Sequence, residues 1–89
     1  LAQGAYWLLE RQLDAAEASL VDAAHRFGVL GCAPALAITT MDQGRLAEAR
    51  GLARSAGPLY RRALDDLRRL GHAREVSELN RLLAGLAPA

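Results

Sequence analysis

The chain has no lysine, one cysteine and few aromatic residues. All eleven basic residues are arginine, a bias typical of a GC-rich genome that carries little chemistry of its own. Cys32 is the single cysteine, which excludes an internal disulfide framework and a cysteine-rich metal site. The formal net charge is +1, so a polyelectrolyte such as nucleic acid is not the default partner.

Long hydrophobic runs are also missing. The longest stretch without a charged residue runs from Phe27 to Met41, and glycine and proline interrupt it. A membrane-spanning helix needs roughly 20 consecutive apolar residues. The N-terminus has no basic segment followed by an apolar block, which is what a secretory signal requires. We therefore expect a cytoplasmic protein with no membrane partner.

The 89 residues are enough for one small domain, and the first part of the chain has the spacing of a helix. Its apolar residues alternate at intervals of three and four: Tyr6, Leu9, Leu13, Ala16, Leu20, Ala23, Phe27 and Leu30. Charged residues occupy positions between them, and a strand would need a spacing of two. The pattern predicts a long helix over about residues 4–28, ended by Gly28 and Gly31.

Two further helices are predicted in the middle of the chain. Pro34 favours a first helical turn, and a short helix follows to Gln43, where Gly44 closes it. The other is a long helix over about residues 45–70. Its apolar positions keep the same phase across Gly57-Pro58, so we expect one helix kinked at the proline, with two abutting helices as the alternative.

A last short helix, about residues 73–84, places Val76, Leu79 and Leu83 on one face. No segment alternates with period two over more than a few residues, so the predicted fold class is all-α. Many stripe positions are alanine, which buries little area. We expect the larger side chains to supply the stability, which is then modest or is increased by an oligomer or by flanking sequence. The larger side chains are Tyr6, Trp7, Leu13, Leu20, Phe27, Tyr60 and the leucine-rich ends.

Two stretches resemble tetratricopeptide-type (TPR) helical repeats. Residues 43–50, Gln-Gly-Arg-Leu-Ala-Glu-Ala-Arg, resemble the tight turn between the two helices of such a repeat. Residues 59–64 with 70–72 resemble the second helix and its exit turn, and residues 11–16 show a similar pattern near the N-terminus. Ala16 and Ala49 are 33 residues apart, close to the family's period of about 34. The resemblance implies antiparallel helical hairpins.

Two short segments make this resemblance more specific. Residues 24–28, Ala-His-Arg-Phe-Gly, and residues 70–76, Leu-Gly-His-Ala-Arg-Glu-Val, are similar to repeats in large bacterial ATPase-type transcriptional regulators. The usual Trp-Leu-Gly-Tyr signature of first helices is absent, and residues 44–71 are about two turns too long for one repeat. A simple bundle of two long and two short helices therefore remains an alternative to the repeat. It also remains open that the chain is a piece of a larger regulator.

Three side chains are candidates for metal or phosphoryl chemistry: His25, Cys32 and His72. No second Cys or His lies at ligand spacing, and nothing in the sequence supplies a base to activate Cys32. Residues 23–28 are faintly similar to a histidine phosphotransfer domain, although the Lys-Gly expected after the histidine is absent. We expect no metal, no cofactor and no enzymatic activity, with phosphotransfer through His25 as a further alternative.

Arginines dominate the second half of the chain. The first 44 residues hold two arginines and five acids, a charge of −3, whereas residues 45–89 hold nine arginines and five acids, a charge of +4. Arg50 and Arg54 are four residues apart on the predicted helix, where like charges repel. They require an acid from elsewhere, and the N-terminal half has the excess.

The same region is similar to a helix-turn-helix segment that binds DNA, from Leu46 to Leu70. Residues 46–55 resemble its first helix and turn, and Leu-Tyr-Arg-Arg at 59–62 then begins a recognition helix. Gly57-Pro58 and about three extra residues lie where that motif is compact. The arginines can instead pair within the helix, as Arg61–Asp65 and Arg62–Asp66.

We expect a non-catalytic helical module for protein–protein interaction or self-association, in keeping with a place inside a transcriptional regulator. It would present a groove between helices, with apolar contacts for affinity and arginines for acidic groups of the partner. The predicted partner-binding residues are Arg50, Arg54, Tyr60 and Arg61. The partner is another protein or a second copy of the chain, and DNA is the alternative.

Overall fold

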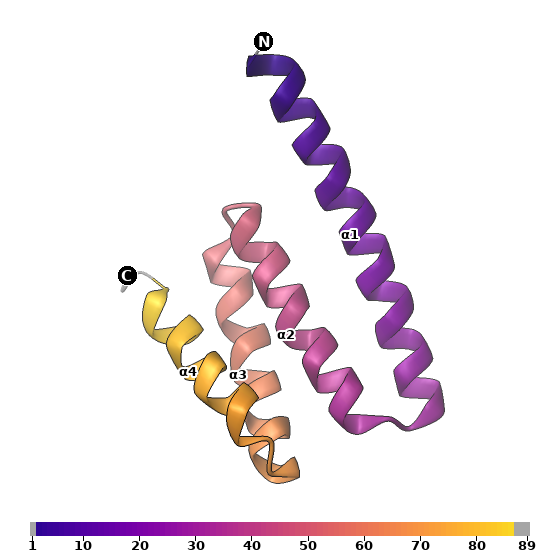
Figure 1. Cartoon of the computed structure of the whole chain (residues 1–89), viewed down its shortest axis with the longest axis vertical. Coiled ribbons are helices and arrows are strands. Elements are labelled where there is room, and N and C mark those ends of the chain that lie inside the picture. The colour runs from indigo at the N-terminus through magenta and orange to yellow at the C-terminus, as the bar shows by residue number, and fades with distance from the viewer. Residues whose placement is uncertain (1, 87–89) are drawn as a thin grey trace.

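The computed structural model of the chain consists of helices joined by short turns. It describes the backbone of residues 2–86 and the side chains of residues 9–86. The helices are α1 (Ala2–Leu30), α2 (Ala33–Ala49), α3 (Ala53–Leu70) and α4 (Ala73–Gly85), and the described backbone contains no strand (Figure 1). The predicted all-α class is confirmed, and the first and last predicted helices agree with α1 and α4 to within two residues.

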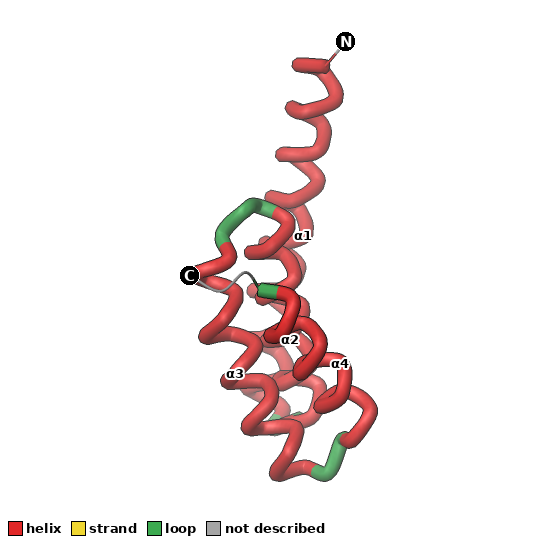
Figure 2. The backbone as a smooth tube through the Cα atoms, turned by 90° about the vertical axis from the view of Figure 1, so that its left-hand side faces the viewer, coloured by secondary structure: helices red, strands yellow, loops and turns green. Residues whose placement is uncertain are grey.

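The first three helices end in the same kind of turn. Gly31, Gly51 and Gly71 have φ angles of 69°, 78° and 78°, which residues other than glycine rarely adopt. The amide that follows each glycine donates to the carbonyl five residues earlier: Cys32 to Phe27 (2.9 Å), Leu52 to Ala47 (2.8 Å) and His72 to Leu67 (3.0 Å). The glycines are 20 residues apart, and at each the chain reverses direction (Figures 1 and 2).

The predicted boundary between the second and third helices is wrong, because the chain turns at Gly51 rather than at Gly44 or Pro58. Gly44 is buried inside α2, where a Cβ would lie 2.5 Å from Cε1 of Tyr60, so it lets α2 and α3 pack closely. Pro58 is exposed in the second turn of α3 and removes one backbone hydrogen bond while the helix continues. The long helix predicted over residues 45–70 is therefore the end of α2 and all of α3.

The buried core lies between α2, α3 and α4. Its members are mostly alanine and leucine: Ala37, Met41, Ala47, Ala56, Tyr60, Ala63, Leu64, Leu67 and Leu79. Leu79 brings α4 into this core, and Arg45 of α2 forms an ion pair with Glu78 of α4. Two threonines of α2 are also buried. Their hydroxyls donate to carbonyls one turn earlier, at 2.8 and 3.1 Å, so neither is buried without a partner.

α1 is the least buried of the helices. It packs against α2, yet none of its side chains between residues 9 and 30 is fully buried. The large side chains predicted to stabilise it, Leu13, Leu20 and Phe27, are half-buried. The predicted contributions of Tyr6 and Trp7 lie outside the side chains that the structure describes. α1 is therefore attached to the core by one face, whose side chains are only half-buried.

α1 is also longer than the helix that covers it. Arg50, the first residue after α2, contacts Asp14 and Glu17, so α2 covers α1 only from about residue 14 onward. At 1.5 Å per residue, the preceding part of α1 extends past α2 by roughly 18 Å. This extension stands clear of the other helices in both backbone views (Figures 1 and 2). The molecule is accordingly elongated, measuring 46 × 33 × 19 Å.

Candidate functional site: the groove between α1 and α3

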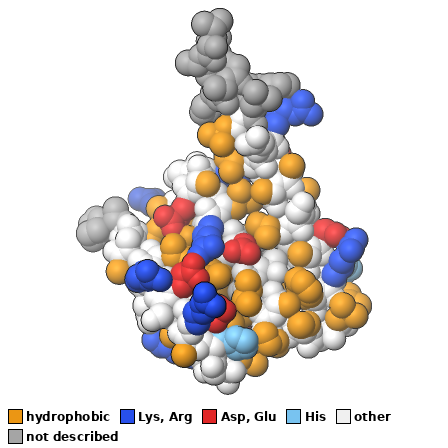
Figure 3. Space-filling view, in the orientation of Figure 1, with side chains coloured by type: hydrophobic (Ala, Val, Ile, Leu, Met, Phe, Trp, Pro, Cys, Tyr) orange, Lys and Arg blue, Asp and Glu red, His pale blue; other side chains and the backbone are white. Residues whose placement is uncertain are grey.

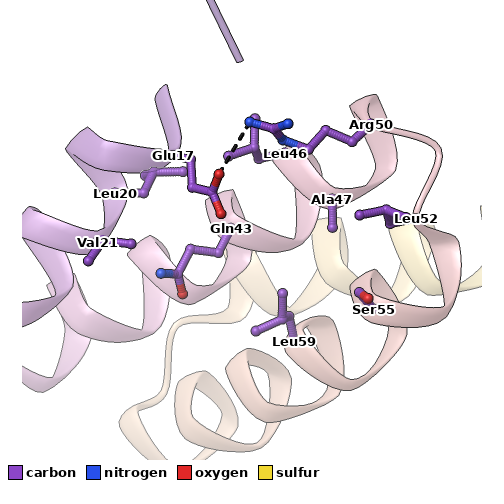
Figure 4. A pocket seen from close by; sticks show the side chains of 10 residues that line it. All are labelled: Glu17, Leu20, Val21, Gln43, Leu46, Ala47, Arg50, Leu52, Ser55 and Leu59. Atoms are coloured by element: carbon purple, nitrogen blue, oxygen red, sulfur yellow. Dashed lines mark hydrogen bonds and ion pairs between the residues drawn. The ribbon is translucent and has the colours of Figure 1, made fainter. Parts of the chain in front are cut away.

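An open groove of about 350 Å³ lies between α1 and the beginning of α3, across α2 (Figure 4). It is lined by residues of all three helices and of the turn after α2. These are Glu17, Leu20, Val21, Gln43, Leu46, Ala47, Arg50, Leu52, Ser55 and Leu59. Six of the ten are apolar, and we call this feature the α1–α3 groove.

The groove exists because α1 and α3 both pack on α2 and make no extensive contact with each other. Val21 projects from α1 with 58% of its surface exposed, and Leu52 in the turn is 51% exposed. Neither side chain has a neighbour that removes it from water. The groove is therefore an apolar surface that folding of this chain leaves open.

A second hollow, of about 330 Å³, lies on the same flank of α2 and α3. Its lining residues are Ala33, Leu36, Asp66, Arg69 and Leu70. Leu36 is seven residues before Gln43, and Asp66 is seven residues after Leu59, so each pair lies two turns apart on one side of its helix. The two hollows therefore follow one another along the α2–α3 pair.

Arg50 joins α2 to α1 at one end of the groove. Its Nη2 donates to Asp14 Oδ1 at 2.7 Å and to Glu17 Oε2 at 3.2 Å. The hydrogen bond to Asp14 is the largest cause that raises the pKa of Arg50 above its ordinary value, and the nearby charges of Asp14 and Glu17 raise it further. The guanidinium therefore stays charged. Its side chain is 21% exposed, whereas those of Asp14 and Glu17 are 69% and 61% exposed. The N-terminal half thus supplies the acid that Arg50 was predicted to require.

The other arginines predicted to bind a partner do not line the groove. Arg54 is exposed in the first turn of α3, and Arg61 is exposed about two turns further along. Arg50 does line it, but its charge is directed at α1 rather than outward. The accessible charges at this end of the groove are therefore the carboxylates of Asp14 and Glu17.

Tyr60 is a core residue, and the prediction that it contacts a partner is wrong. Its side chain is fully buried against Gly44, between α2 and α3. The hydroxyl donates to Glu48 Oε1 at 2.5 Å. Burial is the largest cause that raises the pKa of Tyr60 well above its ordinary value, and the hydrogen bond to the carboxylate of Glu48 is the second. The ring holds α2 and α3 together instead of facing solvent.

The helix-turn-helix alternative does not fit the observed boundaries. Residues 59–62 lie inside α3 rather than at the start of a recognition helix, and the turn falls at residues 50–52. The predicted ion pairs of Arg61 and Arg62 with the two aspartates are not formed within the described part of the chain. Asp66 pairs with Arg69 instead. The basic surface of α3 is therefore accessible, although it does not have the predicted motif.

The three residues considered for metal or phosphoryl chemistry do not line the groove. His25 is exposed near the end of α1, and Cys32 is exposed in the following turn. His72 precedes α4, with its Nδ1 3.8 Å from Glu75 Oε2. Among the side chains that the structure describes, no three or more of His, Cys, Asp and Glu are grouped so as to hold a metal ion.

The sequence predicted a groove between helices and one of its lining residues, Arg50, but it missed Val21, Leu52 and Leu59. Val21 lies outside the three-four stripe of its helix, and so do Leu52 and Leu59 in the stretch that was predicted as one long helix. The one sequence signal for these groove residues is that each is an aliphatic residue outside the apolar stripe of its predicted helix. Only the turn at Gly51 brings these three residues to one place.

Within residues 2–86, no helix combines the length and apolar character required to cross a membrane. Comparison of the chain with known protein families, with curated proteins and with solved structures gives no match.

Proposed function

We propose that this chain is a non-catalytic helical module that binds a protein partner through the α1–α3 groove. The observation that carries the proposal is an apolar groove, open to solvent, between three helices of one small domain. Contiguous exposed apolar surface of this kind is typical of protein-interaction sites. Charged side chains cover much of the α4 side of the molecule, whereas hydrophobic side chains are frequent toward α1 (Figure 3).

An amphipathic helix is the ligand that such a groove fits best. A bound helix presents apolar side chains at positions i, i+4 and i+7 to a groove formed by other helices. The two hollows on the α2–α3 pair have the same two-turn spacing. An extended peptide that binds by adding a strand would need a sheet edge to pair with, and the described backbone offers none.

We also propose that the helices form a TPR-like row rather than a closed bundle. The proposal is supported by the order of packing, since α1 packs on α2, α2 on α3 and α3 on α4. A closed four-helix bundle would add extensive packing between its first and last helices, which the described residues lack. Two helices with their turns take 40 residues here, from Gly31 to Gly71, against about 34 in the family.

A place inside a bacterial transcriptional regulator is a further part of the proposal. It rests on the resemblance of residues 24–28 and 70–76 to repeats of such regulators. A module that binds protein and lacks catalysis is consistent with that place.

A selection from displayed helices tests the binding function. The probe is a library of amphipathic helices of about 16 residues, long enough for four turns, with leucine at i, i+4 and i+7. We expect enrichment on the wild-type chain and loss of the selected helices on Val21→Glu. Val29→Glu is the matched control, because Val29 is equally an exposed valine of α1 but lies outside the groove. Equal enrichment on both variants would contradict the proposal.

DNA binding by α3 is a second candidate, favoured by its exposed arginines. Arg54, Arg61, Arg62 and Arg68 are exposed and form no ion pair within the described residues. A titration with a random-sequence DNA duplex at several salt concentrations tests it. A steep fall of affinity with salt, reduced in Arg61→Ala, would support DNA binding. Absence of binding at low salt would exclude it.

A further inference from the structure

The apolar stripe of α1 continues onto a part of the helix that α2 does not cover. α2 ends opposite Asp14, and the roughly 18 Å of α1 before that point extend past it. Leu9 lies on this extension and is 50% exposed. By sequence the stripe runs on to Tyr6. The extension is therefore a projecting helix with an apolar side.

The α1–α3 groove lies directly beside the base of this extension. Leu20 and Val21 form part of its wall and are about three turns from Leu9 on the same helix. Leu52, in the turn after α2, lines the same groove. A projecting apolar helix and a receiving apolar groove thus occur at the same end of one molecule.

The exposed area of the chain is large for its mass. A compact monomer of 9.5 kDa exposes about 5,000 Å². This chain exposes 6243 Å², an excess of roughly 1,200 Å². A stable protein–protein interface buries about 800 Å² on each partner. The excess is enough for one such interface.

We infer that the groove is occupied by a second copy of this chain, with the α1 extension of each copy lying in the α1–α3 groove of the other. Because both parts lie at one end, a single two-fold axis near that end fills both grooves at once. The contact is isologous and closes at two copies, so it does not propagate into a fibre. The inference rests on the proposed function, since it uses the same groove.

Sedimentation equilibrium over a wide concentration range tests the inference, with fluorescence of Trp7 in parallel. Trp7 is the single tryptophan and lies on the extension by sequence, so its emission reports on contacts there. We expect a concentration-dependent dimer and a blue shift of Trp7 emission on dimerisation. Leu9→Glu and Val21→Glu should each raise the dimer dissociation constant at least tenfold. Val29→Glu should leave the dissociation constant unchanged. Circular dichroism verifies that each variant keeps its helices.

Mixing the two weakened variants gives the sharper result. The Leu9→Glu chain keeps an intact groove, and the Val21→Glu chain keeps an intact extension. Reciprocal insertion predicts that an equimolar mixture forms a heterodimer, with one of its two contacts restored, under conditions where each variant alone is monomeric. A mixture as monomeric as its components would overturn reciprocal insertion.

A wild-type chain that stays monomeric into the millimolar range would overturn the inference altogether. The proposed function is judged separately by the displayed helices. If those bind and Val21→Glu abolishes their binding, the groove receives a helix of another protein and only the second copy is excluded. If the displayed helices also fail, the binding function fails with it.

Discussion

The contact of Gly44 with Tyr60 sets how closely α2 and α3 approach each other. The tyrosine ring lies where the side chain of any residue but glycine would begin. The ring is fully buried, and its hydroxyl reaches the carboxylate of Glu48 at the edge of the core. A single pair of residues from two helices therefore combines close packing with a satisfied polar group.

Gly44→Ala should lower the free energy of unfolding by about 1–3 kcal/mol, because the added methyl group overpacks against the ring. Gly57→Ala is the control. Gly57 is also buried in a helix, but its Cβ would meet the flexible end of Arg61 at 3.1 Å and Leu86 at 3.7 Å. There the higher helix propensity of alanine should offset the contact and leave stability unchanged or slightly higher. Urea unfolding of both variants measures the difference, and equal stabilities would contradict this account.

Stability should fall at alkaline pH because of Tyr60. Its pKa is raised in the folded chain, so the unfolded chain loses the phenol proton first, near pH 10. Above that pH each further unit should cost about 1.4 kcal/mol until the folded pKa is reached; below it the contribution is constant. Tyr60→Phe should flatten the dependence. Unfolding of both proteins between pH 8 and pH 12 is the measurement, and parallel pH profiles would show that another group is responsible.

At the scale of elements, helical periodicity predicted α1 and α4 because each is bounded by a glycine turn and has a regular apolar stripe. It failed between α2 and α3, where three-four spacing continues across the turn at Gly51 by coincidence. Gly44 and Gly51 look alike in sequence. What separates them is the ring of Tyr60 opposite Gly44 and the positive φ of Gly51. Both are consequences of tertiary packing, which also explains why the groove residues were missed.

Gly51→Ala should destabilise the chain by about 1–2 kcal/mol, because alanine is strained at a φ of +78°. Gly28→Ala provides the contrast. Gly28 is helical, with nothing within 4 Å of its Cβ position, so alanine there should stabilise α1 by about 0.5–1 kcal/mol. Thermal unfolding of the two variants is sufficient. Opposite shifts of the midpoint are expected, and a neutral Gly51→Ala would place the helix boundary elsewhere.

On the scale of the whole molecule, the four helices do not share one core. The buried side chains belong to α2, α3 and α4, whereas α1 is held by a half-covered face and by the contacts of Arg50. An element with few buried contacts opens at a lower free energy than the rest of its domain. We therefore expect α1 to separate from α2 before the remaining helices unfold.

Arg50→Ala should make this difference larger. Loss of the contacts with Asp14 and Glu17 should weaken the docking of α1, and the effect should be small because both acids are exposed to solvent. Hydrogen exchange at low protein concentration should show faster exchange in α1 and unchanged protection in α3. Arg45→Ala, which removes the ion pair with Glu78, should instead affect α4. Uniform acceleration across all helices in Arg50→Ala would mean that the chain opens as one unit.

The succession of antiparallel helices, each packed on the one before it, also determines how fast the chain can fold. Nearly all of the packing joins segments that are neighbours in sequence, separated by turns of two or three residues. Short loops cost little entropy to close, and helical proteins dominated by local contacts fold in microseconds to milliseconds. The α2–α3 hairpin, with the most extensive interface, is where folding is expected to begin. α4 would then add on one side, and α1 on the other as the last step.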